Sequence, residues 1–597
     1  MAKSILYFKI IAVLVFSAFF YSCKKTQKTY ETVSVEELIK GLDKLKLSKL
    51  ILFKSNDKQY KPPGVKYFAH CDTLDFFYRI NDGQPIWLSY LKDSAFKTNL
   101  IKILGSAVEH GLKDEFYNKK LIEKYLLKFD SLNEIKTNED YNFLSDLDYT
   151  ISLSVLTLFN DLALGHINPY KFYKPFYTLV SPKTTNFNLF SVLNHPTSFA
   201  DTIAVKAPCT VRYRTLQLIY KYYLDYLSKN KIKDYDTSQK SNSEHNLAVI
   251  DQRLDLLWNS INKVNKKPLE NIAESRDRFV SKTRMMYGLP DGKIDSLFVA
   301  KFVKKSDEII DDILANLEQE RWFSIPDTGK FILIRMTQFL AEIHTDSIRQ
   351  MKVCIGKNKP DDYDERYKQY IKTKNYLQKP INTETPIIQG ELSEIIINPT
   401  WTVPNSIIGK EMFSKIVKNP DYLTQKGYEV LLNGKVISPR SVNWHKFSPY
   451  NVPVKIRQKA GNANSLGILK FNFPNNFNIY MHDTPEKNKF NQANRAVSHG
   501  CIRLHKPTTM AELMLNLQED TTLTDKVRLK LGLQPYDSSL RIEDSLLKPI
   551  KNTEYIRLKT KIKVYLYYRT INVERNGKIT FNYDIYRRNK AIAKKLK

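Results

Sequence analysis

One short stretch in the C-terminal part of this chain gathers the residue types that acyl transfer requires. The sequence contains only five cysteines and ten histidines, yet Cys501 shares the interval 482–505 with His482, His499 and His505. A cysteine acts as a nucleophile when it becomes a thiolate, which needs a base or a positive charge close by. The cluster therefore predicts a cysteine nucleophile, Cys501, served by a nearby histidine base.

The neighbours of Cys501 fit the other needs of such a nucleophile. Gly500 lets the backbone come close to a substrate, so that N–H groups can bind a developing oxyanion. His482 ends an apparent strand at 478–481, from which a loop returns to the cysteine. Arg503 lies two residues past Cys501, which on an extended segment places it on the same face, where it could hold a carboxylate.

Two other interpretations of the cluster remain open at this point. A single cysteine or histidine is more often a buried structural residue, although the full combination argues against that reading. His482, His499, Cys501 and His505 could also bind zinc. Their spacing is not a usual zinc signature and no second cysteine pair supports it, so we expect no metal and no cofactor.

The N-terminus resembles an export signal with a lipid attachment site. Two lysines precede an uncharged apolar run at 10–21, which is too short to span a bilayer comfortably. Ser22 and Cys23 follow at once, as at a bacterial lipoprotein cleavage site. We expect residues 1–22 to be a signal peptide and Cys23 to be lipidated, although a plain signal or anchor with an incidental cysteine is the alternative.

The charge balance narrows the partners only together with the compartment. The chain has 93 Lys and Arg against 63 Asp and Glu, a formal net charge of +30. Such an excess suits an anionic cell wall, acidic lipid or nucleic acid, or it is only a solvated surface. Export makes nucleic acid an improbable partner, so we expect a periplasm-facing lipoprotein of the cell envelope with no nucleic-acid partner.

The positions of apolar residues predict a helical first half and a β-rich second half. Apolar residues at three- and four-residue steps indicate helices over about 30–205 and again over 248–320, with a polar linker at 228–246 between them. After Trp322 short alternating runs predict strands, and 561–586 reads as a hairpin around a central Asn-Gly. We therefore predict an α+β multidomain protein, with a helical N-terminal scaffold followed by a mainly-β domain.

The reactive cluster resembles the signature of the L,D-transpeptidase catalytic domain, or YkuD fold. That signature is a histidine, some fifteen residues, and then Ser/Thr-His-Gly-Cys; here fifteen residues separate His482 from the sequence Ser498-His499-Gly500-Cys501. Further segments resemble the large, multidomain YcbB-like branch of this family, at 316–322, 398–404, 466–471, 480–485 and 564–586.

The resemblance implies a two-step acyl transfer between peptidoglycan stem peptides. Cys501 would attack a stem carbonyl, release the terminal D-alanine and form a thioester, which the side-chain amine of a second stem then resolves into a 3→3 link. His482 would be the proton donor and acceptor, and backbone N–H groups near Gly500 and Cys501 would hold the oxyanion.

The same resemblance assigns supporting roles around the nucleophile. It implies substrate contacts for Tyr480, Ser498 and Arg503. His499 departs from the multidomain branch, which often has serine there, so we expect it to play a supporting role only.

The resemblance also implies a domain order. We expect a signal peptide at 1–22, a helical scaffold at 24–227, a linker and partial peptidoglycan-binding-like helical region at 228–310, and a catalytic domain at 311–597. Within the catalytic domain, the segment at about 400–465 would form a lid. Two rival functions stay open: an L,D-carboxypeptidase that uses the same residues with water as acceptor, and a non-catalytic wall-binding lipoprotein.

Overall fold

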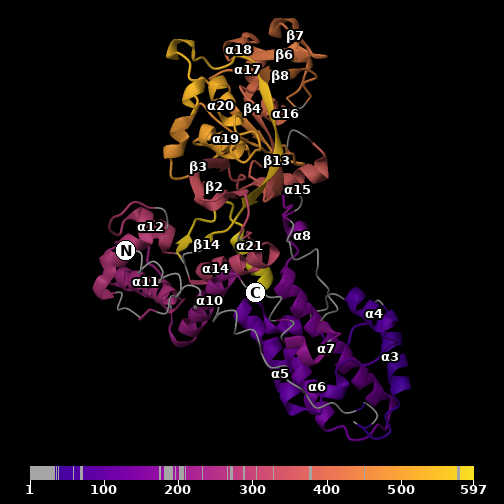
Figure 1. Ribbon diagram of the computed structural model, residues 1–597. Helices are drawn as coiled ribbons and strands as arrows, with labels where there is room; N and C mark the ends of the chain where they lie inside the picture. The colour runs from indigo at the N-terminus through magenta and orange to yellow at the C-terminus, as the bar shows by residue number, and fades with distance from the viewer. Residues whose placement is uncertain are drawn as a thin grey trace.

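The computed structural model covers a chain with two helical arms and a β-rich domain (Figure 1). It describes residues 34, 37, 39–57, 60–66, 71–173, 176–179, 192–194, 196–200, 203, 208, 210–231, 233–264, 267–268, 273–286, 289–303, 306–326, 328–375, 379–449, 451–574 and 578–597. The predicted signal peptide and Cys23 lie outside these residues. Within them, no helix is both long enough and apolar enough to cross a membrane.

The first helical arm is built around one long buried helix, α7 (Asn138–Leu164). Thr137 and Asp140 form a capping box at its start, and the helix is buried on nearly all sides, with polar as well as apolar side chains inside. Asp148 on α7 is buried and accepts backbone N–H groups of Ile86 and Trp87, at 3.0 and 2.8 Å. The other helices of this arm are α3 (Lys44–Asn56), α4 (Cys71–Ile80), α5 (Ser94–Gly105) and α6 (Lys119–Asp130).

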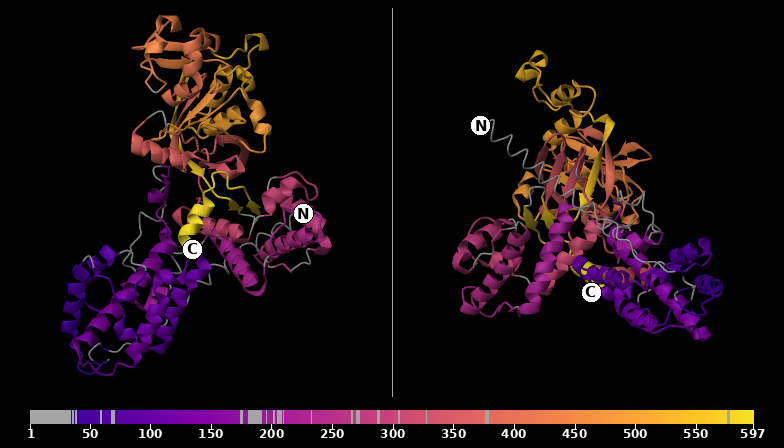
Figure 2. Two further views of the ribbon diagram at one scale, coloured as in Figure 1. Left: turned by 180° about the vertical axis from the view of Figure 1, so that it is seen from behind. Right: turned by 60° about the horizontal axis from the view of Figure 1, so that its bottom comes forward.

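A second set of helices connects this arm to the β-rich domain. It comprises α8 (Pro169–Tyr173), α10 (Val211–Lys229), α11 (Glu244–Val264), α12 (Arg276–Met286), α13 (Ser296–Phe302) and α14 (Ser306–Trp322). Figure 2 shows α11 and α12 diverging from the first arm, on the other side of the β-rich domain's base. The predicted linker at 228–246 is shorter than expected, because α10 and α11 extend into both of its ends.

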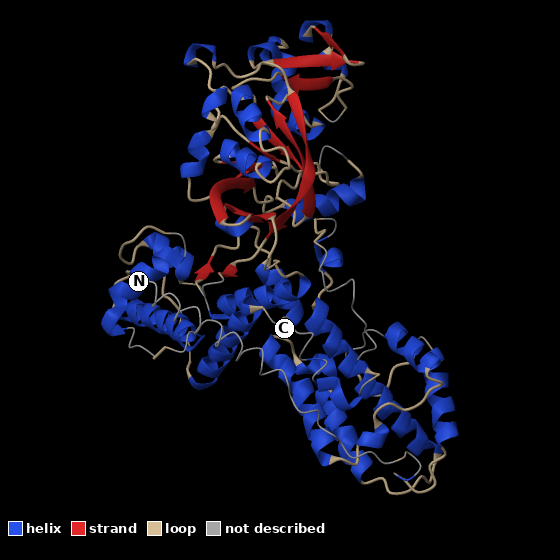
Figure 3. Ribbon diagram, in the orientation of Figure 1, coloured by secondary structure: helices blue, strands red, loops and turns tan. Residues whose placement is uncertain are grey.

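Most strands of the chain lie together in the β-rich domain (Figure 3). Its main sheet has nine strands in the order β11-β3-β12-β10-β9-β4-β13-β1-β2 and is mixed. Because β2 also pairs with β3, the strands from β3 round to β2 close into a ring. The strands are β1 (Phe331–Arg335), β2 (Leu340–His344), β3 (Ile348–Gly356), β4 (Gln389–Ile397), β9 (Leu469–Asn472), β10 (Met481–His482), β11 (Ala496–Ser498), β12 (Ile502–Leu504) and β13 (Glu554–Tyr567). The predicted order of a helical region followed by a mainly-β domain is confirmed.

The predicted C-terminal hairpin is present but smaller than expected. Strands β14 (Ile571–Val573) and β15 (Ile579–Phe581) pair antiparallel around its turn, whose central residues lie outside the described ranges. The alternating run at 561–567 belongs instead to β13, which pairs with β4 and β1 in the main sheet. Burial within that sheet therefore overrides the local hairpin pattern at 561–567.

Residues 401–458, within the segment expected to form a lid, make up a small module with its own sheet and core. Strands β5 (Trp401–Thr402), β8 (Lys455–Gln458), β6 (Tyr428–Leu432) and β7 (Lys435–Ile437) pair in that order. Helices α16 (Asn405–Ile407), α17 (Phe413–Lys418) and α18 (Asp421–Gln425) pack against them. Trp444 is 2 % exposed in this core, so its role is packing.

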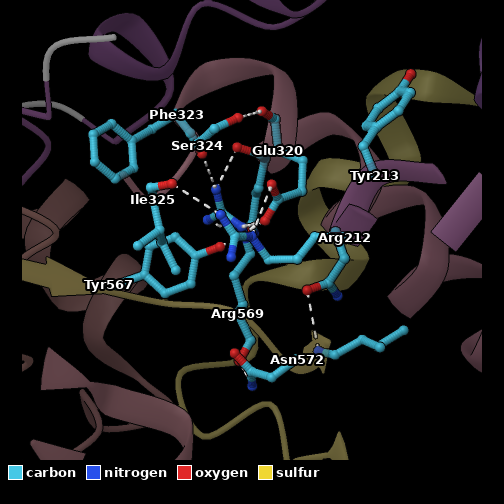
Figure 4. Close-up of polar contacts among 12 residues, drawn as sticks. Arg212, Tyr213, Glu320, Phe323, Ser324, Ile325, Tyr567, Arg569 and Asn572 are labelled. Carbon is cyan, nitrogen blue, oxygen red and sulfur yellow. Dashed lines mark hydrogen bonds and ion pairs between the residues drawn. The ribbon is translucent and has the colours of Figure 1, made fainter. Parts of the chain in front are cut away.

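A buried ionic cluster joins the helices to the β-rich domain (Figure 4). Glu320 on α14 accepts the Tyr567 hydroxyl at 2.6 Å and forms ion pairs with Arg569 at 3.6 Å and Arg212 at 3.9 Å. Arg569 also donates to the Gln319 side chain at 2.9 Å. Buried charges remain stable only when such partners are present, so this cluster fixes the orientation of α14 against β13.

Replacing Arg569 with methionine should destabilise this junction strongly. The substitution leaves buried Glu320 with only the more distant charge of Arg212 and removes the donor to Gln319, for which we expect a loss of about 3–5 kcal/mol in the free energy of unfolding. Thermal unfolding, together with tryptic cleavage between α14 and β1, measures the effect. Lys229→Met is the matched control, because its ion pair with Asp225 is 67 % and 63 % exposed and should contribute less than about 1 kcal/mol. Equal thermal midpoints for the two variants would contradict this role of the cluster.

Candidate active site

The pairing of β10 with β12 sets the geometry of the predicted site. The two strands run parallel, with Met481 opposite Ile502 and His482 opposite Arg503. Met481 and Ile502 are fully buried in the core. Because side chains alternate along a strand, His482 and Arg503 therefore lie on the other face of the sheet.

Cys501 lies beside the same face, directly before β12. The register places it opposite Tyr480, and the Ile502 N–H donates to the Tyr480 carbonyl at 3.0 Å. The Cys501 thiol donates to the Asn478 carbonyl at 3.8 Å, and the backbone N–H and hydroxyl of Tyr480 lie close enough to the sulfur to lower its pKa. His482 is then the diagonal neighbour of Cys501, and a strand spacing of about 4.8 Å with a rise of about 3.3 Å per residue puts their Cα atoms roughly 8 Å apart, within reach of an aromatic ring. The two residues expected to carry the chemistry are thus next to each other on one face.

The strand before His482 is shorter than the sequence indicated. β10 begins at Met481, and Asn478 has a left-handed φ of 54°. The side chain of Asn475 accepts the N–H groups of Phe477 at 3.0 Å and Ile479 at 3.2 Å, which forms a turn. Asparagine tolerates this conformation and competes with the sheet for backbone hydrogen bonds, so 478–480 is not part of the strand.

The environment of His482 prepares its ring to accept a proton. Its Nδ1 donates to the backbone carbonyl of Asp483. A carbonyl can only accept, so Nδ1 carries the ring proton and Nε2 remains an acceptor. Burial, followed by the charge of Arg503, lowers the pKa of His482 to about 3. The imidazole is therefore neutral at physiological pH.

The thiol of Cys501 is also neutral in this resting arrangement. Burial raises the pKa of Cys501, although the hydrogen bonds from Tyr480 and the charges of Lys470 and Arg503 oppose that shift. A neutral thiol beside a neutral imidazole is not a preformed ion pair. The nucleophile must therefore form by proton transfer to His482 as the reaction begins.

Lys470 is a site residue that sequence reasoning did not identify as functional. It lies opposite His482 on β9, and its Nζ is 4.1 Å from the centroid of the Tyr480 ring. The pKa of Lys470 is lowered, and burial of its ammonium group is the largest cause. Lys470, His482 and Arg503 thus form a row across three neighbouring strands. Only the strand register reveals this row, and no local sequence pattern does.

Polar groups of the loop before Cys501 form hydrogen bonds with one another. Ser498, expected to contact substrate, is 3 % exposed; its hydroxyl accepts the Gly500 N–H at 3.1 Å and donates to the Cys501 carbonyl at 2.6 Å. This geometry suits shaping the loop rather than binding substrate. It also engages the Gly500 N–H, which was expected to serve the oxyanion. No hydrogen bond to the Cys501 N–H forms within the described ranges, so that group is the better oxyanion donor.

Two charged residues of the expected site have partners at its edge. His499 points to the small module and its Nε2 lies 2.6 Å from Glu411, so it is not next to the nucleophile as a second base. Arg503 forms an ion pair with Glu486. A substrate carboxylate would therefore have to replace or share Glu486 as the partner of Arg503.

The zinc interpretation gains no support from this geometry. In the part of the chain that the structure describes, no three His, Cys, Asp or Glu side chains gather as metal ligands. His499 turns to Glu411, and the ring of His505 packs 5.1 Å from that of Phe490. The four potential ligands therefore point to separate partners.

Two parts of the chain match models of known protein families. Residues 329–528 match the family model of the L,D-transpeptidase catalytic domain, YkuD, and residues 72–218 match the Scaffold domain model. Over 273 residues the chain is 29 % identical to a Haemophilus influenzae (strain ATCC 51907 / DSM 11121 / KW20 / Rd) protein named "Putative L,D-transpeptidase". The match covers 45 % of this chain and 47 % of that relative, about half of its length.

The reactivity of Cys501 with iodoacetamide should rise steadily with pH. Because burial raises the thiol pKa above its usual value of 9.0, the rate should show no plateau between about pH 5 and pH 7. Mass spectrometry of the alkylated peptide measures the rate, with Cys501→Ala correcting for the other cysteines. A plateau in acid would instead demonstrate a preformed thiolate and imidazolium pair.

Proposed function

Since this chain carries a YkuD L,D-transpeptidase catalytic domain preceded by a scaffold domain, we propose that it cross-links peptidoglycan stem peptides through a cysteine thioester. The observation that supports this most directly is the β10–β12 register, which places His482 beside Cys501 on one face. A neutral imidazole whose Nε2 accepts no hydrogen bond from the described residues, beside a thiol, is the arrangement that general-base activation requires.

In the first step the thiol becomes acylated. Nε2 of His482 takes the Cys501 proton as sulfur attacks the carbonyl of the third stem residue. The oxyanion that develops accepts the Cys501 N–H. When the tetrahedral intermediate collapses, His482 returns the proton to the departing amine of the terminal D-alanine, and a thioester remains on Cys501.

In the second step a stem amine takes the acyl group. The side-chain amine of a second stem's third residue, commonly diaminopimelate, attacks the thioester carbonyl. His482 removes a proton from that amine and supplies it to the departing sulfur. The product is a 3→3 link between two stems, and both residues return to their resting states. If water attacked instead, the same residues would give L,D-carboxypeptidase activity.

The positive row beside the nucleophile suits an anionic substrate. Lys470 and Arg503 flank His482, and stem peptides carry carboxylates. Arg503 would exchange Glu486 for a substrate carboxylate, which a guanidinium can bind through two parallel hydrogen bonds. Tyr480 would contact the acyl chain near the thiol.

The small module suits a cover over the thioester. The Trp401 side chain hydrogen bonds with Tyr480, and Glu411 of the same module reaches His499. Both contacts come from the first part of the module and tie it to Tyr480 and to His499. Such a cover would keep water from the thioester until an amine arrives.

We also propose that the protein faces the periplasm and is anchored through a lipid on Cys23. The support is the sequence alone: an apolar run with Ser22 and Cys23 directly after it. Peptidoglycan stems are found outside the cytoplasmic membrane, so this location would place the enzyme with its substrate.

Incubation with tetrapeptide muropeptides should produce cross-linked dimers. Cys501→Ala should abolish them, and His482→Gln should lower their rate of formation by about 10²–10⁴-fold, the usual contribution of a general base. Product masses decide between the functions: dimers demonstrate transfer, and tripeptide monomers alone demonstrate a carboxypeptidase. If the wild type neither forms product nor is acylated by a carbapenem, the protein is a wall binder and not an enzyme.

Trp401→Ala should shift the products from transfer towards hydrolysis. Removing the indole opens one edge of the cover, so the ratio of tripeptide monomer to dimer should rise roughly severalfold. Trp401→Phe is the control, because it removes the indole N–H but keeps an aromatic ring at this position. An unchanged ratio in both variants would exclude the cover from control of water.

A further inference from the structure

We propose that Thr385 is a positioning residue that orients the Cys501 N–H towards the developing oxyanion. The inference rests on the proposed function, because an oxyanion develops only if Cys501 is acylated. Thr385 lies 115 positions before Gly500 and is fully buried. It belongs to none of the motifs around the nucleophile.

The hydroxyl of Thr385 holds one specific peptide group. Its Oγ1 donates to the Gly500 carbonyl at 2.8 Å and accepts the Gly356 N–H at 2.9 Å. Because the hydroxyl proton is the only one available, the bond from Gly356 fixes the direction in which Oγ1 donates. The Gly500 carbonyl is thus held at a defined position.

This contact determines where the Cys501 N–H points. The Gly500 carbonyl and the Cys501 N–H belong to one planar trans peptide, in which they point in opposite directions. Holding the carbonyl on Thr385 therefore turns the N–H away from the buried loop and keeps it unengaged by the described residues. Gly500 has a φ of 116°, a region open chiefly to glycine, so the peptide could rotate readily if it were not held.

Thr385 is itself fixed by a closed set of hydrogen bonds. Its own N–H donates to the Tyr586 hydroxyl at 3.1 Å, and that hydroxyl donates to the Gly356 carbonyl at 2.8 Å. A side chain at Gly356 would meet the Thr383 carbonyl at 1.9 Å, so the two segments approach as closely as glycine allows. Buried networks in which every member has a partner are rigid.

The network also connects to the helical region. Glu384, next to Thr385, forms a buried ion pair with Arg588 at 3.1 Å. The Arg588 guanidinium lies 5.1 Å from the ring centroid of Tyr173 on α8. The segment that carries Thr385 is therefore also anchored through Glu384, which leaves little freedom for the Gly500 carbonyl.

Comparing two reactions of the same thiol tests this role. Acylation by a carbapenem forms the sulfur–carbon bond at a carbonyl, breaks the lactam bond and passes through an oxyanion. Alkylation by iodoacetamide displaces iodide at a saturated carbon and forms no oxyanion. Thr385→Val removes the hydroxyl at nearly constant volume, and Thr385→Ser keeps it as the matched control.

We expect Thr385→Val to slow acylation by about 10- to 100-fold and to leave alkylation at the wild-type rate. Removing an oxyanion donor costs about 10²–10³-fold, and a donor that has lost only its orientation should cost less. Thr385→Ser should acylate at close to the wild-type rate. Equal acylation of the valine variant and the wild type overturns the inference, as does a parallel loss of both reactions, which indicates a general change at the thiol.

A second variant decides the matter if Thr385→Val does not fold. Tyr586→Phe removes the hydroxyl that anchors the Thr385 N–H but keeps the Thr385 hydroxyl, so acylation should slow by a few-fold with alkylation unchanged; unchanged acylation overturns the inference. The wild type separates this failure from that of the proposed function. A wild type that is alkylated but never acylated, by carbapenem or stem peptide, contradicts both proposals.

Discussion

The parallel pairing of β10 with β12 is the constraint on which the site depends. A slip of one residue would turn His482 into the core and bring Met481 to the reactive face, because strand side chains alternate. The register is held from both sides: Met481 and Ile502 are fully buried, and Met481 also pairs with Phe471 on β9. The hydrophobic core therefore positions the imidazole beside the thiol, although none of its members takes part in the chemistry.

The burial that fixes these residues also sets their charge state. Removing water from His482 and Cys501 favours their neutral forms, so the pKa of the imidazole falls and that of the thiol rises. An ion pair at rest would gain reactivity but would expose a thiolate to oxidation. The neutral pair keeps the thiol unreactive until substrate is bound, and the row of Lys470 and Arg503 then favours the thiolate over the thiol as it forms.

Sequence reasoning could propose residues for the site but could not propose their contacts. The spacing of His482 and Cys501 and the helical-then-β order are local signals, and the fold order is confirmed. Ser498 and the Gly500 N–H could not be placed correctly, because their hydrogen bonds close a loop whose shape the sequence does not report. The sequence could not indicate a role for Thr385 for a different reason. Its hydroxyl contacts the Gly500 carbonyl across 115 positions, and no sequence pattern links residues so far apart. The export signal at 1–22 remains a prediction, since it lies outside the described residues.

The helical region is attached firmly to the β-rich domain, because charged side chains of both parts are buried and paired where the helices meet the sheet. Glu320 on α14 forms buried ion pairs with Arg569, two residues past the end of β13, at 3.6 Å and with Arg212 on α10 at 3.9 Å. Separating such a pair leaves a buried charge without a partner, which costs far more than separating apolar surfaces of similar size. Sliding of the helices over the sheet is therefore disfavoured, and a rigid attachment results. Since Arg588 and Glu384 extend the same kind of contact to the segment that holds the Gly500 carbonyl, the orientation of the nucleophile's backbone depends on a framework that begins in the helices.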